Sequence, residues 1–187
     1  MTRLPILVGA GVLLATSAYA QPQRHDPLTP LEVDKIRDSA MEPEVRLKLY
    51  VEFARARLDK LQQARSDAKL TATDKDEQTK GAIQDFTEVY DELDENVDTF
   101  ADRGNDLRKA LKPVIEADTE FGAKLRAFKS SLANSRQEAA QYDFLVGSAL
   151  EAVDAGAKDH RDLLAEQEVT FKHKKDKGHK GKSDQAD

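Results

Sequence analysis

A seven-residue apolar repeat runs through the middle of the chain and constrains its fold more than any other feature. From Ile83 to Leu132, apolar residues recur at alternating steps of three and four, and only Gly104 and Asp118 interrupt the pattern. A repeat held this long is typical of helices that pack side by side as in a coiled coil. Turn-forming Gly (9) and Pro (6) are scarce, and 34% of the residues are charged. The sequence therefore predicts an all-α fold, an elongated antiparallel helical bundle with coiled-coil-like packing.

The repeat allows two arrangements. Because its phase continues through Gly104, and a link of one or two residues is short for neighbouring helices, we expect one long central helix over about 76–132. Pro113 would kink this helix, since its ring removes one backbone hydrogen bond. The alternative is a four-helix up-down bundle with a tight turn at Gly104-Asn105.

Capping residues and prolines indicate the other helix boundaries. Thr29 and Glu32 have the spacing of a capping box, and Pro30 fits the first helical position, so a short helix is expected to begin there. Pro43 disfavours helix at the residue before it, which ends this helix. A second helix is then expected over about 43–66, where apolar residues recur at helical spacing.

The N-terminus has the pattern of a secretory signal peptide. Arg3 precedes a short apolar run, and Ala18-Tyr19-Ala20 places small residues where a signal peptidase reads them. Cleavage at Ala20-Gln21 would leave a periplasmic or extracellular protein, and a glutamine at position 21 excludes a lipid anchor on cysteine. The chain has no cysteine, which excludes disulfides and thiol chemistry.

The remainder is expected to form one helical-bundle domain with an exposed segment at each end. Its last helix is predicted from Asn134 or Ser135 to about Phe171, and the Lys/His-rich residues beyond it are expected to be disordered. The predicted segments are a signal peptide (1–20), an exposed lead-in (21–28), the bundle domain (29–171) and the tail (172–187).

The charges are distributed unevenly between the expected bundle and the tail. Residues 21–171 carry 22 basic and 32 acidic side chains, a net charge of −10, whereas residues 172–187 have a net charge of +3. The acidic body argues against a nucleic-acid partner. The basic tail is suited to weak contact with an anionic envelope surface.

Two groups of side chains are candidate metal ligands, although a solvated surface explains each of them as well. One is an acidic stripe that recurs at steps of three and four; the other is a pair of histidines in the tail. The stripe does not have the spacing of an EF-hand. The candidates are Glu88, Asp91, Glu95, Asp98 and Asp102 in the stripe, and His173 and His179 in the tail.

Asp118 interrupts the apolar repeat, and His160 lies at an apolar position of the last predicted helix. If the last two helices form a hairpin centred near residue 133, Asp118 lies level with about residue 148 and not with residue 160. The offset of twelve residues corresponds to about 18 Å along a helix, too far for a hydrogen bond. The two side chains are therefore expected to be separate.

The sequence favours a protein that is not an enzyme. It has no Gly-x-Ser-x-Gly motif, no phosphate-binding glycine loop, no Glu-x-x-His pair and no transmembrane span, and no cofactor is implied. The leading hypothesis is an exported helical bundle that acts through protein–protein association, including self-association. One alternative is a cation-binding envelope protein that uses the acidic stripe or the tail.

A second alternative comes from two short motifs. Leu28-Thr29-x-x-Glu32 and Leu70-Thr71-x-x-Asp74 loosely resemble the paired Leu-Thr-x-x-Gln motifs of small periplasmic helical stress chaperones, although neither carries the glutamine. This resemblance implies a periplasmic chaperone or stress-sensing protein that binds unfolded clients.

Overall fold

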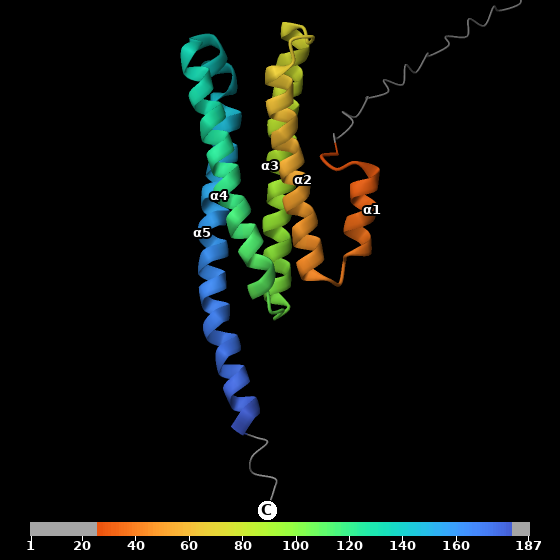
Figure 1. Ribbon diagram of the computed structural model, residues 1–187, viewed down its shortest axis with the longest axis vertical. Coiled ribbons are helices and arrows are strands. Elements are labelled where there is room, and N and C mark those ends of the chain that lie inside the picture. The colour runs from red at the N-terminus through yellow and green to blue at the C-terminus, as the bar shows by residue number, and fades with distance from the viewer. Residues whose placement is uncertain (1–25, 181–187) are drawn as a thin grey trace, which may run out of the picture.

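The computed structural model describes residues 26–180, and the side chains of all of these except Asn134 and residues 173–180. The part described contains five α-helices and no strand, which confirms the all-α prediction (Figure 1). A single 3₁₀ turn, Leu132–Asn134, joins the last two helices. The α-helices are α1 (Pro30–Asp38), α2 (Pro43–Ser66), α3 (Ala72–Asp102), α4 (Arg108–Ser131) and α5 (Arg136–Lys180).

Two helical hairpins lie side by side and form the bundle. One hairpin is α2 with α3 and the other is α4 with α5, and α1 folds back along the outside of α2 (Figure 1). The second helix has the bounds that its prolines and apolar spacing predicted, about 43–66.

The prediction of one long helix over about 76–132 is wrong, because the chain turns at Gly104. Gly104 has φ +74°, in the left-handed region that glycine adopts without steric strain. Its N–H donates to the carbonyl oxygen of Ala101 at 2.8 Å, and the N–H of Asn105 donates to that of Phe100 at 3.1 Å. This pair of hydrogen bonds is a Schellman motif, which ends α3. The alternative turn at Gly104-Asn105 is therefore the one that the chain adopts.

A side chain from α5 stabilises this turn. The N–H of Leu107 donates to Oε1 of Gln167 at 2.7 Å, and Nε2 of Gln167 donates to the carbonyl oxygen of Asn105 at 3.1 Å. Both backbone groups would otherwise lack partners at the end of the bundle. Gln167 therefore replaces the side-chain cap that α4 lacks at its own N-terminus.

The apolar repeat forms the core, as predicted. Its residues pack around an aromatic cluster in which the ring of Phe121 meets those of Phe86 and Tyr90 edge-on. Because α2, α3 and α4 have similar lengths of 24, 31 and 24 residues, the seam is covered within the chain. The buried apolar residues of the repeat are Ile83, Phe86, Tyr90, Leu93, Val97, Phe100, Leu107, Leu111, Val114, Phe121, Leu125, Phe128 and Leu132.

The last helix is longer than predicted. It was expected to end near Phe171, whereas α5 has 45 residues and continues to Lys180. Figure 1 shows its C-terminal end projecting beyond the other helices. The predicted signal peptide, most of the lead-in and residues 181–187 lie outside the described part of the chain.

Both Leu-Thr motifs mark the beginning of a helix. The Thr29 hydroxyl accepts from the N–H of Glu32, and the Glu32 carboxylate accepts from the N–H of Thr29, so the predicted capping box is present. The Thr71 hydroxyl likewise accepts from the N–H of Asp74 at the start of α3. Helix capping thus accounts for both motifs.

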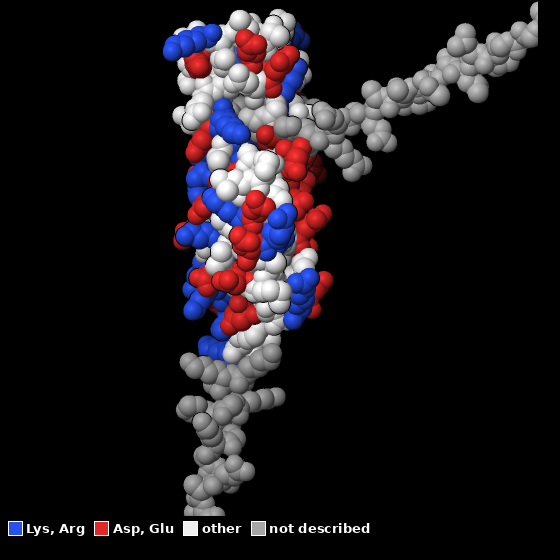
Figure 2. Space-filling view, turned by 90° about the vertical axis from the view of Figure 1, so that its right-hand side faces the viewer, with Lys and Arg blue, Asp and Glu red and all other residues white. Residues whose placement is uncertain are grey.

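No helix between residues 26 and 180 combines the length and hydropathy needed to cross a bilayer. On the face that carries α1 and α2, positive and negative side chains alternate along the bundle (Figure 2).

Candidate functional site

Three helices each contribute one side chain to a buried polar cluster in the middle of the bundle. Asp118 on α4 lies at its centre, with Tyr90 from α3 on one side and His160 from α5 on the other. The Tyr90 hydroxyl donates to Oδ1 of Asp118 at 2.8 Å, and Nδ1 of His160 lies 2.9 Å from Oδ2. All three residues are at most 2% exposed. Asp118 therefore has a hydrogen-bonding partner for each of its carboxylate oxygens.

The cluster reaches the surface through a fourth residue. Nε2 of His160 lies 3.2 Å from Oδ1 of Asp94 on α3, an ion-pair contact without a hydrogen bond. The Asp94 side chain is 43% exposed. The imidazole ring thus bridges a buried carboxylate and a half-exposed one.

These contacts determine the charge of His160. Burial lowers its pKa, but the hydrogen bond and negative charge of Asp118, together with the contact and charge of Asp94, outweigh burial and raise the pKa to about 9. The ring is therefore an imidazolium at neutral pH, and its Nδ1–H donates to Asp118. Burial and the negative charge of Asp118 also raise the pKa of Tyr90, which remains a neutral donor.

The expectation that Asp118 and His160 are separate is wrong, because the hairpin register differs from the one assumed. A hairpin centred at residue 133 pairs position 122 with position 144, whereas Gly122 faces Val153, nine residues further along α5. The same displacement shifts the position on α5 that lies level with Asp118 from about residue 148 to about residue 157. His160 then lies three residues away, about one helical turn, and the two side chains span that distance.

The cluster joins three helices of the bundle. Both carboxylate oxygens of Asp118 are bonded within the cluster, to Tyr90 and to His160. A buried ion pair of this kind can fix the register of the helices that it joins. The cluster therefore links α3, α4 and α5 at one level of the bundle.

The acidic stripe is exposed along α3. Glu88, Asp91, Glu95, Asp98 and Asp102 all lie on the solvent side of the helix. Partial desolvation raises the pKa of Asp91 and of Asp98, and the negative charge of nearby carboxylates, first of all that of Asp94, raises both further. The stripe thus carries mutually repelling charges.

No three His, Asp or Glu side chains among those described come together in a way that could hold a metal ion. The side chains of the other two candidate ligands, His173 and His179, lie outside the described ones.

A buried arginine that the sequence reasoning missed holds α1 against the bundle. Arg57 on α2 is 2% exposed, and its two terminal nitrogens donate to the Glu32 carboxylate at 2.7 and 2.6 Å. One of them also donates to the carbonyl oxygen of Pro27 at 2.5 Å. At the other end of α1, Arg46 donates to the carbonyl oxygen of Ile36 at 2.9 Å. Helical spacing places Arg57 on the apolar face of α2. This position was the signal in the sequence that the side chain of Arg57 would be buried.

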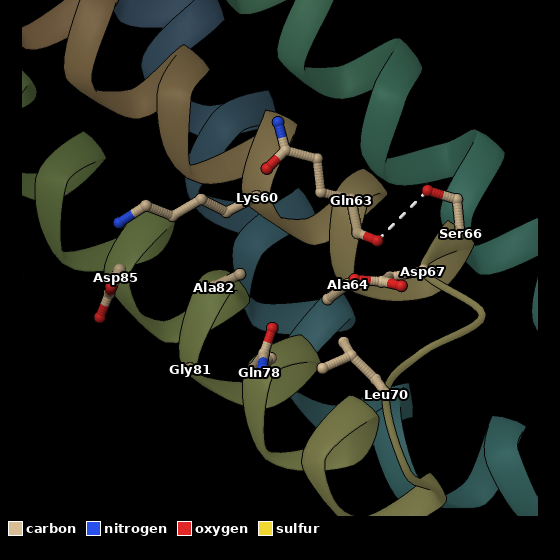
Figure 3. Close-up of a pocket in the computed structure, with 10 residues that line it drawn as sticks. All are labelled: Lys60, Gln63, Ala64, Ser66, Asp67, Leu70, Gln78, Gly81, Ala82 and Asp85. Carbon is tan, nitrogen blue, oxygen red and sulfur yellow. Dashed lines mark hydrogen bonds between the residues drawn. The ribbon is translucent and has the colours of Figure 1, made fainter.

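A groove of about 680 Å³ lies between α2 and α3, beyond the point where α1 begins (Figure 3). Small residues form its floor, and charged and amide side chains stand along its edges. Figure 3 shows Lys60 and Asp85 at one end and Leu70 at the other. The remaining lining residues are Gln63, Ala64, Ser66, Asp67, Gln78, Gly81 and Ala82.

Comparison of the chain with known protein families, with curated proteins and with solved structures finds no match.

Proposed function

We propose that this protein is an exported helical bundle that acts through protein–protein association, without an enzymatic activity. The observation that carries the proposal is the projecting end of α5. This helix runs to Lys180, past Gln167, where it contacts the turn between α3 and α4 (Figure 1).

Apolar side chains at the start of the projecting end are partly exposed. The guanidinium of Arg108 lies 5.2 Å from the ring centre of Phe171, and Val169 is 59% exposed. Isolated helical segments shorter than about 12 residues are marginal in water and gain stability from packing. A partner that packs along this end would supply that stabilisation, and the lysines that follow favour an acidic partner surface.

The buried cluster supports the non-enzymatic part of the proposal. Catalysis needs an acid, base or nucleophile that a substrate can reach. Asp118 and His160 are the strongest candidates for such groups, and both are enclosed by the core and bonded to each other.

Site-specific photo-crosslinking in the cells that produce the protein tests the proposed protein–protein association. A benzophenone side chain at position 169 would report contacts at the projecting end, and one at position 144 provides a matched control. Phe144 is also an exposed apolar residue of α5, at 81% exposure, but it lies alongside α4, where the neighbouring Asp143 pairs with Lys129.

We expect one discrete adduct from position 169 and none from position 144. An adduct of twice the monomer mass would identify the partner as a second copy of the chain. The absence of an adduct at position 169, or the same adducts at both positions, would contradict the proposal.

A further inference from the structure

We propose that the groove between α2 and α3 receives residues 21–25 of the same chain, in extended form. This inference is independent of the association proposed above. It rests on the continuity of the groove with the binding site of α1, on its dimensions and on its lining.

The groove continues the surface on which α1 already lies. Arg57, which binds Glu32 and Pro27, stands on one face of α2 with Lys60, Ala64 and Asp67, at steps of three, four and three. On α3, Gln78, Gly81, Ala82 and Asp85 have helical spacing on one face. α1 and Pro27 cover the section of this surface nearest Arg57, and the section beyond Lys60 is open (Figure 3).

The chain approaches the open section in the right direction. α1 begins next to Arg57 and ends next to Arg46, so the residues before Pro27 precede it on the side of the groove. From Arg57 to Asp67 is ten residues of helix, about 15 Å. Cleavage of the predicted signal peptide after Ala20 would leave five residues before Asp26, and five extended residues span about 17 Å, which matches the length of the groove.

The lining is suited to an extended peptide. Nothing lies within 4 Å of the position that a Cβ on Gly81 would take, and Ala64 and Ala82 are similarly small, so a backbone can approach the floor closely. Gln63 and Gln78 offer amide donors and acceptors at the edges. Arg24 is the one fully charged side chain of residues 21–25, and the carboxylate of Asp67 lies in the lining of the groove.

Blocking the groove tests the proposal through the exposure of Arg24 to protease. In the full chain, Gly81→Leu would fill the open space above the floor. Gly147→Leu is the matched control, because Gly147 is also half-buried within a helix and also has nothing within 4 Å of its would-be Cβ. Circular dichroism verifies that both variants remain folded.

We expect trypsin to cleave after Arg24 about tenfold faster in Gly81→Leu than in the wild type, because a docked segment is cleaved only when it opens. Gly147→Leu should match the wild type. Equal cleavage rates in the wild type and Gly81→Leu would overturn the proposal.

A disulfide trap gives a second test that does not depend on filling the groove. Because the chain has no cysteine, a pair introduced by Gln23→Cys and Gln63→Cys is the only one that can form. The control replaces Gln62 in place of Gln63, since Gln62 lines the other side of α2, towards α4. We expect an intramolecular disulfide under mild oxidation with Gln63→Cys and not with Gln62→Cys. A disulfide between two chains would identify a second copy as the occupant, and equal yields from both pairs would show that there is no preferred position; either result would overturn the proposal.

Discussion

The hydroxyl oxygen of Tyr90 lies 2.5 Å from the point that a Cβ on Gly156 would occupy. A glycine at this position of α5 therefore allows the phenol of α3 to pass and reach Asp118, to which it donates a hydrogen bond at 2.8 Å. The absence of one side chain on α5 is thus part of how the buried cluster forms.

We expect Gly156→Ala to destabilise the protein by about 1–3 kcal/mol, although alanine is the better helix former. The added methyl would displace the Tyr90 hydroxyl or push α5 away from α3, and overpacking of this kind outweighs the gain in helix propensity. Gly147→Ala is the control, because a methyl there meets nothing within 4 Å and should stabilise by about 0.5–1 kcal/mol. Urea unfolding of both variants measures the difference, and a stabilised Gly156→Ala would contradict this account.

The charge of His160 makes the stability depend on pH in the alkaline range. Its pKa is about 9 in the folded protein and 6.5 as the ordinary value. Because the folded pKa is the higher one, the contribution of His160 to the free energy of unfolding is fully present below pH 6.5 and is lost as the pH rises through 9. A difference of this size corresponds to about 3 kcal/mol of unfolding free energy. We expect urea unfolding at pH 6 and pH 10 to show a loss of this order.

The variant His160→Asn separates this effect from other groups that titrate at high pH. Its amide can still donate towards Asp118 but does not titrate. The variant should be less stable than the wild type at pH 6, and the difference between the two should shrink by pH 10. A constant difference across this range would show that His160 is not the titrating group.

The sequence predicted the core well because burial follows spacing. All the apolar residues of the repeat are buried, including Phe100 and Leu107 on either side of the turn. For the same reason the repeat could not reveal the turn: the seven-residue step is a distance along the chain, and the loop happens to preserve it. The positive φ of Gly104 and the two hydrogen bonds of the Schellman motif distinguish the two arrangements.

The buried cluster could not be predicted because it depends on helix register. The sequence singled out Asp118 and His160 as polar residues on apolar seams, but their distance follows from where two helices cross, which is a property of tertiary packing. A displacement of nine residues at Gly122 separates the assumed pairing from the observed one. The small residue at position 156 was an available signal of close approach, although nothing in the sequence identified Tyr90 as its neighbour.

Loss of the Glu32 carboxylate should detach α1. Hydrogen bonds from Arg57 lower the pKa of Glu32 to about 2. The stabilisation that the Glu32 carboxylate provides is therefore present above pH 4.5 and is lost as the pH falls towards 2. Glu32→Gln leaves the buried charge of Arg57 uncompensated, which we expect to cost about 3 kcal/mol at neutral pH. Hydrogen exchange of the amides in α1 measures this local opening.

The exposed pair Asp34–Arg37 provides a control within the same helix. Its two side chains are 62% and 70% exposed, and pairs of this kind contribute less than about 1 kcal/mol. Asp34→Asn should therefore leave exchange in α1 nearly unchanged. The difference in α1 hydrogen exchange between Glu32→Gln and the wild type should also become smaller between pH 4.5 and 2, as the wild-type carboxyl becomes protonated. Equal exchange in the two variants at neutral pH would exclude a special role for the Glu32–Arg57 pair.

Gln167 should be needed for the stability of the turn between α3 and α4. Gln167→Met keeps the length of the side chain but removes the acceptor of the Leu107 N–H and the donor to the Asn105 carbonyl, and buried backbone groups left without partners cost about 1–3 kcal/mol each. We expect a loss of at least 2 kcal/mol in urea unfolding, with much faster hydrogen exchange at the Leu107 amide. Gln62→Met, on an exposed glutamine of α2, should change the unfolding free energy by less than about 0.5 kcal/mol. Unchanged exchange at Leu107 in Gln167→Met would mean that another group, and not α5, holds the turn in place.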